Sequence, residues 1–308
     1  MDITISHNGT NITWEYDQEC LEECCLGSTV AVSAYAIALT LLAILSTIEN
    51  IVVLSAFYKH EELRSPSIML FGVLAFIDLL SGAMVTPIKV SLTLGHDHLL
   101  DHIFWSLFTA VVFFSLATIL VISTDAFLRV YFLERYAMTK RKMAGILLVA
   151  WLPSFVITIC VCTDLHHHVN VDHFAVGLFF SCVVMIVVVY VAMLCMLKRH
   201  SANVVDNVSR SRIENERRAV KTTLIIVMTC IVMNLPPACA FLGVWSPAFC
   251  AVTFYSFLAN AAVNPVLYCW RIPVMRKHVR QILCFTKKNG NVEESEDAFL
   301  SVDLDTNV

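Results

Sequence analysis

Seven long apolar runs constrain the fold of this chain more than any other feature. They cover residues 30–57, 67–93, 103–128, 144–163, 174–197, 220–244 and 250–270. Each is long enough to cross the hydrocarbon core of a bilayer as a helix, and a helix satisfies its own backbone polar groups, as lipid requires. The 308 residues are 58% hydrophobic and only 15% charged, which is too little charge for a water-soluble protein. We therefore expect an all-α membrane protein, a bundle of seven transmembrane helices.

The distribution of Lys and Arg predicts the orientation of this bundle. Twenty of the 21 lie in or directly beside the first, third and fifth connections or after the last run, and Lys89 is the exception. Basic residues concentrate on the cytoplasmic side of membrane proteins, so the N-terminus should lie outside a cell membrane that the chain crosses several times. Asn8 and Asn11 stand in glycosylation acceptor patterns, which agrees with an extracellular N-terminus.

The apolar runs and the distribution of basic residues divide the chain into four parts. Residues 1–28 form an extracellular N-terminal segment, 29–271 the bundle, 272–286 a short amphipathic helix on the inner leaflet, and 287–308 a disordered cytoplasmic tail. Apolar and basic residues alternate at helical spacing in the third part, which is typical of a helix that lies on membrane lipids. Cys284 is a candidate for palmitoylation or a free thiol. The last three residues are a candidate ligand for a PDZ protein.

The seventh run contains residues that an isolated membrane helix disfavours. Asn260 and Asn264 lie one turn apart on one face, and Pro265 removes a backbone donor. The carbonyl that Pro265 frees needs another partner in lipid, and we expect the two asparagines to provide it. Asp78, a lone acid in the second run, must also face the bundle. The sequence therefore predicts a kinked seventh helix beside a polar seam.

An Asn-Pro-x-x-Tyr motif ends at Tyr268 and is followed by the basic amphipathic stretch. This combination resembles the class A (rhodopsin-like) G-protein-coupled receptors. The pair Glu49 and Asn50, and the absence of the usual Cys near Asp101, resemble the melanocortin, lysophospholipid, cannabinoid and adenosine branch. The resemblance covers about residues 30–285. It implies a receptor that binds a small extracellular ligand and acts on heterotrimeric G proteins and arrestin.

The resemblance also implies a sodium ion held by Asp78, Asn260 and Asn264. The alternative is a protonated, hydrogen-bonded carboxyl at Asp78 with no ion, and we expect no other cofactor. In class A receptors a further set of residues takes part in activation. Transferred to this chain, that set is Asp125, Arg129, Tyr190, Glu216, Pro236, Pro265 and Tyr268.

The Asp-Arg-Tyr motif of the family is altered here. Ala126 replaces its Arg, which in the family grips an acid on the sixth helix. Glu216 stands where that acid is expected, and Arg129 lies on nearly the same face as Ala126 and could partly substitute. The change leaves a second interpretation open, an atypical, weakly coupling or decoy receptor or a scaffold.

The ligand pocket implied by the resemblance includes Phe108, Asn234 and Leu258. Phe108 stands where amine receptors carry Asp, and Leu258 where opsins carry the retinal-binding Lys, so neither ligand is expected. A lipid-like or small neutral molecule is favoured. Lys89 has two alternatives. It either extends to the outer headgroups or faces the cavity and binds an anionic group of the ligand.

The extracellular side is rich in Cys and His. Disulfides are expected there, without a defined pairing; the candidates are Cys20, Cys24, Cys25, Cys160, Cys162 and Cys250. Seven His with several Asp in two outer loops could sense protons or zinc, or form an ordinary solvated surface. The chain shows no accessible nucleophile–base set, so we expect no enzyme and no nucleic-acid partner. It also lacks the internal repeats of transporters.

Overall fold

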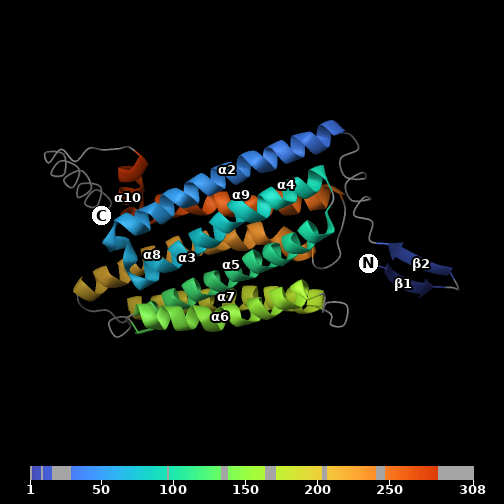
Figure 1. Cartoon of the computed structure of the whole chain (residues 1–308). Coiled ribbons are helices and arrows are strands. Elements are labelled where there is room, and N and C mark those ends of the chain that lie inside the picture. The colour runs from blue at the N-terminus through green and yellow to red at the C-terminus, as the bar shows by residue number, and fades with distance from the viewer. Residues whose placement is uncertain are drawn as a thin grey trace.

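The computed structural model describes residues 2–7, 10–15, 29–95, 97–132, 138–163, 171–202, 207–240 and 247–283. Long helices run side by side to form one bundle (Figure 1). The bundle helices are α2 (Thr29–Lys59), α3 (Pro66–Leu80), α4 (Thr86–Leu94), α5 (His98–Phe132), α6 (Lys140–Cys162), α7 (Val171–Ala202), α8 (Asn207–Ala240) and α9 (Pro247–Arg271). The short helix α10 (Pro273–Leu283) packs against α2 and α9 at one end of the bundle (Figure 1).

The spans match the predicted membrane bundle. Six stretches of the described chain are long and apolar enough to cross a bilayer, and α3 and α4 together make one of them. The seventh predicted span is α9, whose 25 residues also suffice for a crossing although it contains two asparagines and a proline. The predicted all-α membrane architecture is confirmed, including the amphipathic helix α10.

The second span is interrupted by a π-helical turn, η2 (Ser81–Val85). The side chain of Thr86 donates to the carbonyl of Ser81, which helps to hold the wider turn. Gly82 permits close contact with α2, since a Cβ there would lie 2.8 Å from Thr47 Oγ1. A π turn contains an extra residue, so α4 and its Lys89 are rotated relative to α3. The sequence did not reveal this turn.

The N-terminal segment contains a β-hairpin that we did not predict. Strand β1 (Asp2–His7) pairs with the antiparallel strand β2 (Thr10–Glu15). Asn11 belongs to β2, opposite Ser6. Asn8, the other predicted glycosylation site, lies outside the described residues, as do Cys284 and the predicted cytoplasmic tail.

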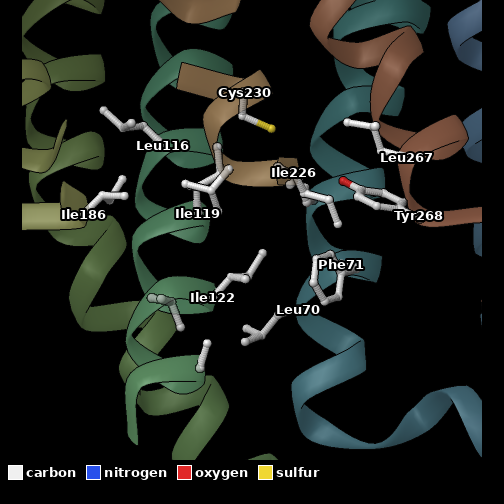
Figure 2. Close-up of a cluster of buried hydrophobic side chains, with 14 of the residues drawn as sticks. Leu70, Phe71, Leu116, Ile119, Ile122, Ile186, Ile226, Cys230, Leu267 and Tyr268 are labelled. Atoms are coloured by element: carbon white, nitrogen blue, oxygen red, sulfur yellow. The ribbon is translucent and has the colours of Figure 1, made fainter. Parts of the chain in front are cut away.

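The buried side chains form two clusters at different depths. The inner cluster joins α3, α5, α7, α8 and α9 and includes Leu116, Ile226 and Tyr268. Figure 2 shows Tyr268 with its hydroxyl directed into the bundle toward Ile226. The Tyr268 ring meets Phe71 edge-on, with 5.4 Å between ring centroids. The outer cluster is aromatic and joins α2, α4, α5 and α9.

Two of the six cysteines that are candidates for disulfides form none in the described structure. Cys160 and Cys162 are both free thiols. They lie two residues apart at the C-terminal end of α6. The side chains of the other four candidates, Cys20, Cys24, Cys25 and Cys250, lie outside the described residues.

Candidate functional site

The carbonyl that Pro265 frees belongs to Ala261, four residues earlier in α9. It accepts a hydrogen bond of 3.1 Å from Asn50 Nδ2 of α2. The same amide donates to the Ser46 carbonyl at 2.9 Å, so both of its N–H groups are used. We expected Asn260 and Asn264 to satisfy this carbonyl, and that expectation is wrong. The carbonyl of α9 that has no backbone donor instead receives a hydrogen bond from Asn50, a fully buried side chain of the neighbouring helix α2.

A chain of polar groups crosses the middle of the bundle from α3 to α8. Asn264 Nδ2 donates to Asp78 Oδ2 at 2.8 Å, and the Cys230 thiol donates to Asn264 Oδ1 at 3.2 Å. Asn234 Nδ2 then donates to the Cys230 carbonyl at 2.8 Å. All four side chains are buried. Helices α3, α9 and α8 are therefore connected by directional bonds at membrane depth, where no bulk water competes for them.

Several buried side-chain oxygens of the bundle have no hydrogen-bond partner among the described residues. They include Asn260 Oδ1, one turn before Asn264 on α9, and Ser115 Oγ on α5, a helix that packs against α3. Hard cations prefer oxygen ligands, so a carboxylate with nearby amide and hydroxyl oxygens suits a small cation. Asp78 and Asn264 are brought together as predicted. Ser115 was missed, because one serine in an apolar run gives no distinguishing signal.

The sixth span contains a second proline whose freed backbone carbonyl is hydrogen-bonded by a side chain of another helix. Pro237 has no N–H for the carbonyl of Met233, four residues earlier in α8. That carbonyl accepts a hydrogen bond of 2.7 Å from Ser256 Oγ of α9. Pro236, which the resemblance places among the activation residues, precedes it directly. The double-proline segment of α8 is thus fastened to α9 by one hydroxyl that the sequence analysis did not single out.

Aromatic side chains close the outer half of the bundle around Lys89. The small cavity there is lined by Leu39, Val85, Thr86, Lys89, Phe104, Phe254 and Phe257. Lys89 Nζ lies 4.8 Å from the ring centroid of Phe254 and 5.6 Å from that of Phe104, distances typical of cation–π contacts. Of the two alternatives for Lys89, the side chain takes the cavity-facing one.

The predicted pocket residues Phe108 and Leu258 belong to the same outer cluster. The Phe108 ring meets Phe257 with 4.9 Å between centroids. The space left in the cavity is ≈ 10 Å³, which is room for about one water molecule. A larger ligand must therefore displace aromatic side chains to enter. Asn234 lies in the polar chain below rather than among these rings.

At the end of the bundle that the sequence predicts to be cytoplasmic, Arg129 pairs with Asp125 one turn before it. The separation is 2.8 Å, and the Asp125 side chain is only 2% exposed. Arg129 is thus paired with a residue of its own helix in this state. This pairing limits its ability to replace the family Arg that is missing at Ala126. The Glu216 side chain lies outside the described residues. The hydroxyls of Tyr190 and Tyr268 are buried without a partner in the described structure.

Cys230 and Ser256 are the residues of this site that sequence reasoning missed most clearly. Cys230 lies within an apolar run, and its only signal in the sequence is its place one turn before Asn234. Ser256 could have been sought by asking which side chain meets the carbonyl freed by Pro237. Within the described ranges, no three His, Cys, Asp or Glu side chains gather as a metal site. Most of the outer-loop His, including His96 and 166–168, lie outside those ranges.

Comparisons with known proteins agree with this arrangement. Residues 49–173 match the family model of the 7 transmembrane receptor (rhodopsin family). Melanocortin receptor 5 of Mus musculus is 24% identical over 277 residues, covering 79% of this chain and 82% of its own length. Melanocortin receptor 5 of Rattus norvegicus and melanocortin receptor 4 of Danio rerio are 22% and 21% identical with the same coverage.

Proposed function

We propose that this chain, which belongs to the rhodopsin family of seven-transmembrane receptors, recognises a lipid-like or small neutral ligand from outside the cell or from the outer leaflet. Ligand binding would shift α8 and open a cytoplasmic cleft for a heterotrimeric G protein. The N-terminus would be extracellular. Arrestin, a PDZ protein and membrane lipids complete the set of proposed partners.

The observation that carries this proposal is the position of the Ser256 hydrogen bond. Ser256 stands between Phe254 and Phe257, two walls of the outer cavity, and it holds the Met233 carbonyl at the proline segment of α8. A ligand that displaces the rings of Phe254 and Phe257 would also move the turn of α9 that carries Ser256. That turn is hydrogen-bonded to the proline segment of α8. This is a physical route by which ligand binding can change the relative stability of two helix arrangements.

Lys89 supports a refinement of the ligand class. A cation in an apolar, aromatic pocket favours a ligand with one anionic group and an apolar body, since the anion gains an ion pair in a low-dielectric setting. The aromatic rings would cover the apolar part. The relatives are named melanocortin receptors, so a melanocortin peptide belongs in the same ligand screen.

We also propose that Asp78, Asn260 and Asn264 hold a sodium ion. The partnerless oxygen of Asn260 beside the Asp78–Asn264 hydrogen bond supports this assignment. A bound ion would supply positive charge that stabilises the buried carboxylate. The residues themselves orient the oxygens and keep α3 and α9 in contact.

The test of the proposed function is G-protein recruitment in cells that express the full chain. Candidate lipids, including anionic ones, small neutral molecules and a melanocortin peptide are first selected by their effect on the melting temperature of the purified protein. A selected ligand should then recruit at least one G-protein class. Binding without recruitment of any class would contradict the receptor function as stated.

One observation favours the second interpretation, a weakly coupling or decoy receptor. Ala126 supplies no charge, and Arg129 is paired with Asp125 in the same helix. Restoring the family Arg separates the two possibilities. If the wild type is a weak coupler, Ala126→Arg should raise recruitment at equal surface expression, whereas an unchanged response would show that Ala126 does not limit coupling.

A further inference from the structure

The cytoplasmic end of the bundle contains a histidine pair that the proposed function does not use. His278 lies on the inner face of α10 and is 4% exposed. Its Nε2 is 3.0 Å from Glu62 Oε2 of the 3-10 turn η1 (Glu61–Arg64), and its Nδ1 is 3.1 Å from Gln281 Oε1. Both ring nitrogens therefore face oxygen atoms. A ring with two N–H donors, the imidazolium form, satisfies both contacts.

The ring of His60 stacks on His278 from the first cytoplasmic connection. The ring centroids are 3.9 Å apart and the planes differ by 23°. Two positive rings at that distance would repel each other, so the stack requires a neutral His60. Partial burial, and then the charge of His278, lower the pKa of His60 below its usual value of 6.5. The hydrogen bond from His278 lowers the pKa of Glu62 and keeps it ionised.

Most of the charged groups that act on His60 oppose a proton on its ring. Lys59 at the end of α2 and Lys277 on α10 oppose a proton on His60, and Glu62 alone favours one. Two other charged side chains at this end of the bundle have contacts of their own in the described structure. Glu61 lies 3.7 Å from Arg64, and the Arg271 guanidinium lies 4.2 Å from the Trp270 ring centroid.

We propose that His60 and His278 form an acid-sensitive latch that ties α10 to the first cytoplasmic connection and releases it when the cytoplasm acidifies. Above pH 6.5, the usual value for His, His60 is neutral whether α10 is docked or free, and the stack contributes fully. As the pH falls below that value, the free state takes up the proton first. The docked state therefore loses stability progressively, until His60 is protonated in both states.

Hydrogen–deuterium exchange of the full-length protein in lipid nanodiscs tests this latch directly. The exchange rates of the α10 amides are measured between about pH 7.5 and pH 5.5 and corrected for the intrinsic pH dependence, with the amides of α5 as an internal reference. We expect the corrected rates in α10 to rise about fivefold or more at the acidic end while those of α5 stay constant. A constant α10 rate over this range in the wild-type protein would overturn the proposal.

Two substitutions identify the group responsible. His60→Phe keeps an aromatic ring on His278 but cannot be protonated, so protection of α10 should become independent of pH. His60→Arg carries a permanent charge, so α10 should exchange rapidly at every pH. If His60→Phe retained the wild-type pH dependence, another group would be titrating and the latch as described would be wrong. No step depends on ligand or G protein, so the result is independent of the proposed function.

Discussion

Asn50 contributes to the bundle through a single amide group. Its two N–H groups meet the Ser46 and Ala261 carbonyls, the second of which lost its own partner to Pro265. An unsatisfied carbonyl at this depth costs free energy that water cannot recover. The polar residue in α2 and the proline in α9 therefore form one structural unit, although they lie far apart in the sequence.

Asn50→Ala should destabilise the folded bundle by about 1–3 kcal/mol, because the Ala261 carbonyl is left without a donor. Pro265→Ala restores the backbone N–H that this carbonyl normally receives. In the Pro265→Ala background, the decrease in the free energy of unfolding caused by Asn50→Ala should be less than half of its value in the wild type. Unfolding measurements on the four proteins of this double-mutant cycle give the coupling. Equal losses in both backgrounds would show that Asn50 acts elsewhere.

Asp78→Asn tests the proposed sodium site at the same scale. We expect the melting temperature of the wild-type protein to be a few degrees higher in sodium chloride than in choline chloride, since a ligand of the folded state stabilises it. The variant should show no such difference, because a neutral amide attracts the cation far less. Ser115→Ala, which changes no charge, is the comparison variant. It should reduce the difference in melting temperature between sodium chloride and choline chloride only partially. A sodium effect that survives Asp78→Asn would place the ion elsewhere.

Lys89→Ala removes the only charge that we place in the outer cavity. For an anionic ligand we expect a loss of affinity of about tenfold or more, equivalent to about 1.4 kcal/mol. Lys89→Arg keeps the charge and should retain much of the affinity. Binding measured on purified protein, with surface expression as a control for folding, checks both. If a neutral ligand of similar shape loses as much affinity as the anionic one, Lys89 acts through packing rather than charge.

At the scale of elements, α8 and α9 are coupled at the proline segment of α8. Ser256→Ala should weaken the contact between these helices and increase ligand-independent G-protein recruitment about two- to fivefold, because the hinge loses the bond that fastens it. Pro237→Ala restores the backbone donor for Met233, so Ser256→Ala should have little effect in that background. Recruitment that falls in Ser256→Ala would mean that the bond stabilises the active arrangement instead.

The elements themselves were largely predictable, because lipid forces apolar residues into continuous helices of a minimum length. The spans and the kink residue Pro265 follow from that requirement, whereas the approach of Asp78 to Asn264 was implied by the resemblance to class A receptors. The π turn η2 does not follow from the requirement, since its extra residue depends on how Gly82 packs against α2. The partners of the freed carbonyls were also unpredictable in detail. Helical spacing within one chain segment does not say which neighbouring helix lies closest.

At the scale of the whole molecule, the account describes one bundle with two functional ends joined by a polar middle. The outer end is aromatic and carries Lys89, the middle carries the hydrogen bonds among Asp78, Asn264 and Cys230, and the inner end carries the pair Asp125 and Arg129. These assignments have meaning only if the outer end faces the extracellular space. Orientation is therefore the claim on which the proposed function depends.

The most direct test places one epitope tag before Met1 and another after Val308 in the same expressed protein. Antibodies are then applied to intact and to permeabilised cells. The account predicts that the N-terminal tag is stained in intact cells and the C-terminal tag only after permeabilisation, since an odd number of spans puts the two ends on opposite sides of the membrane. Staining of the C-terminal tag in intact cells, or of both tags only after permeabilisation at confirmed surface expression, would contradict it.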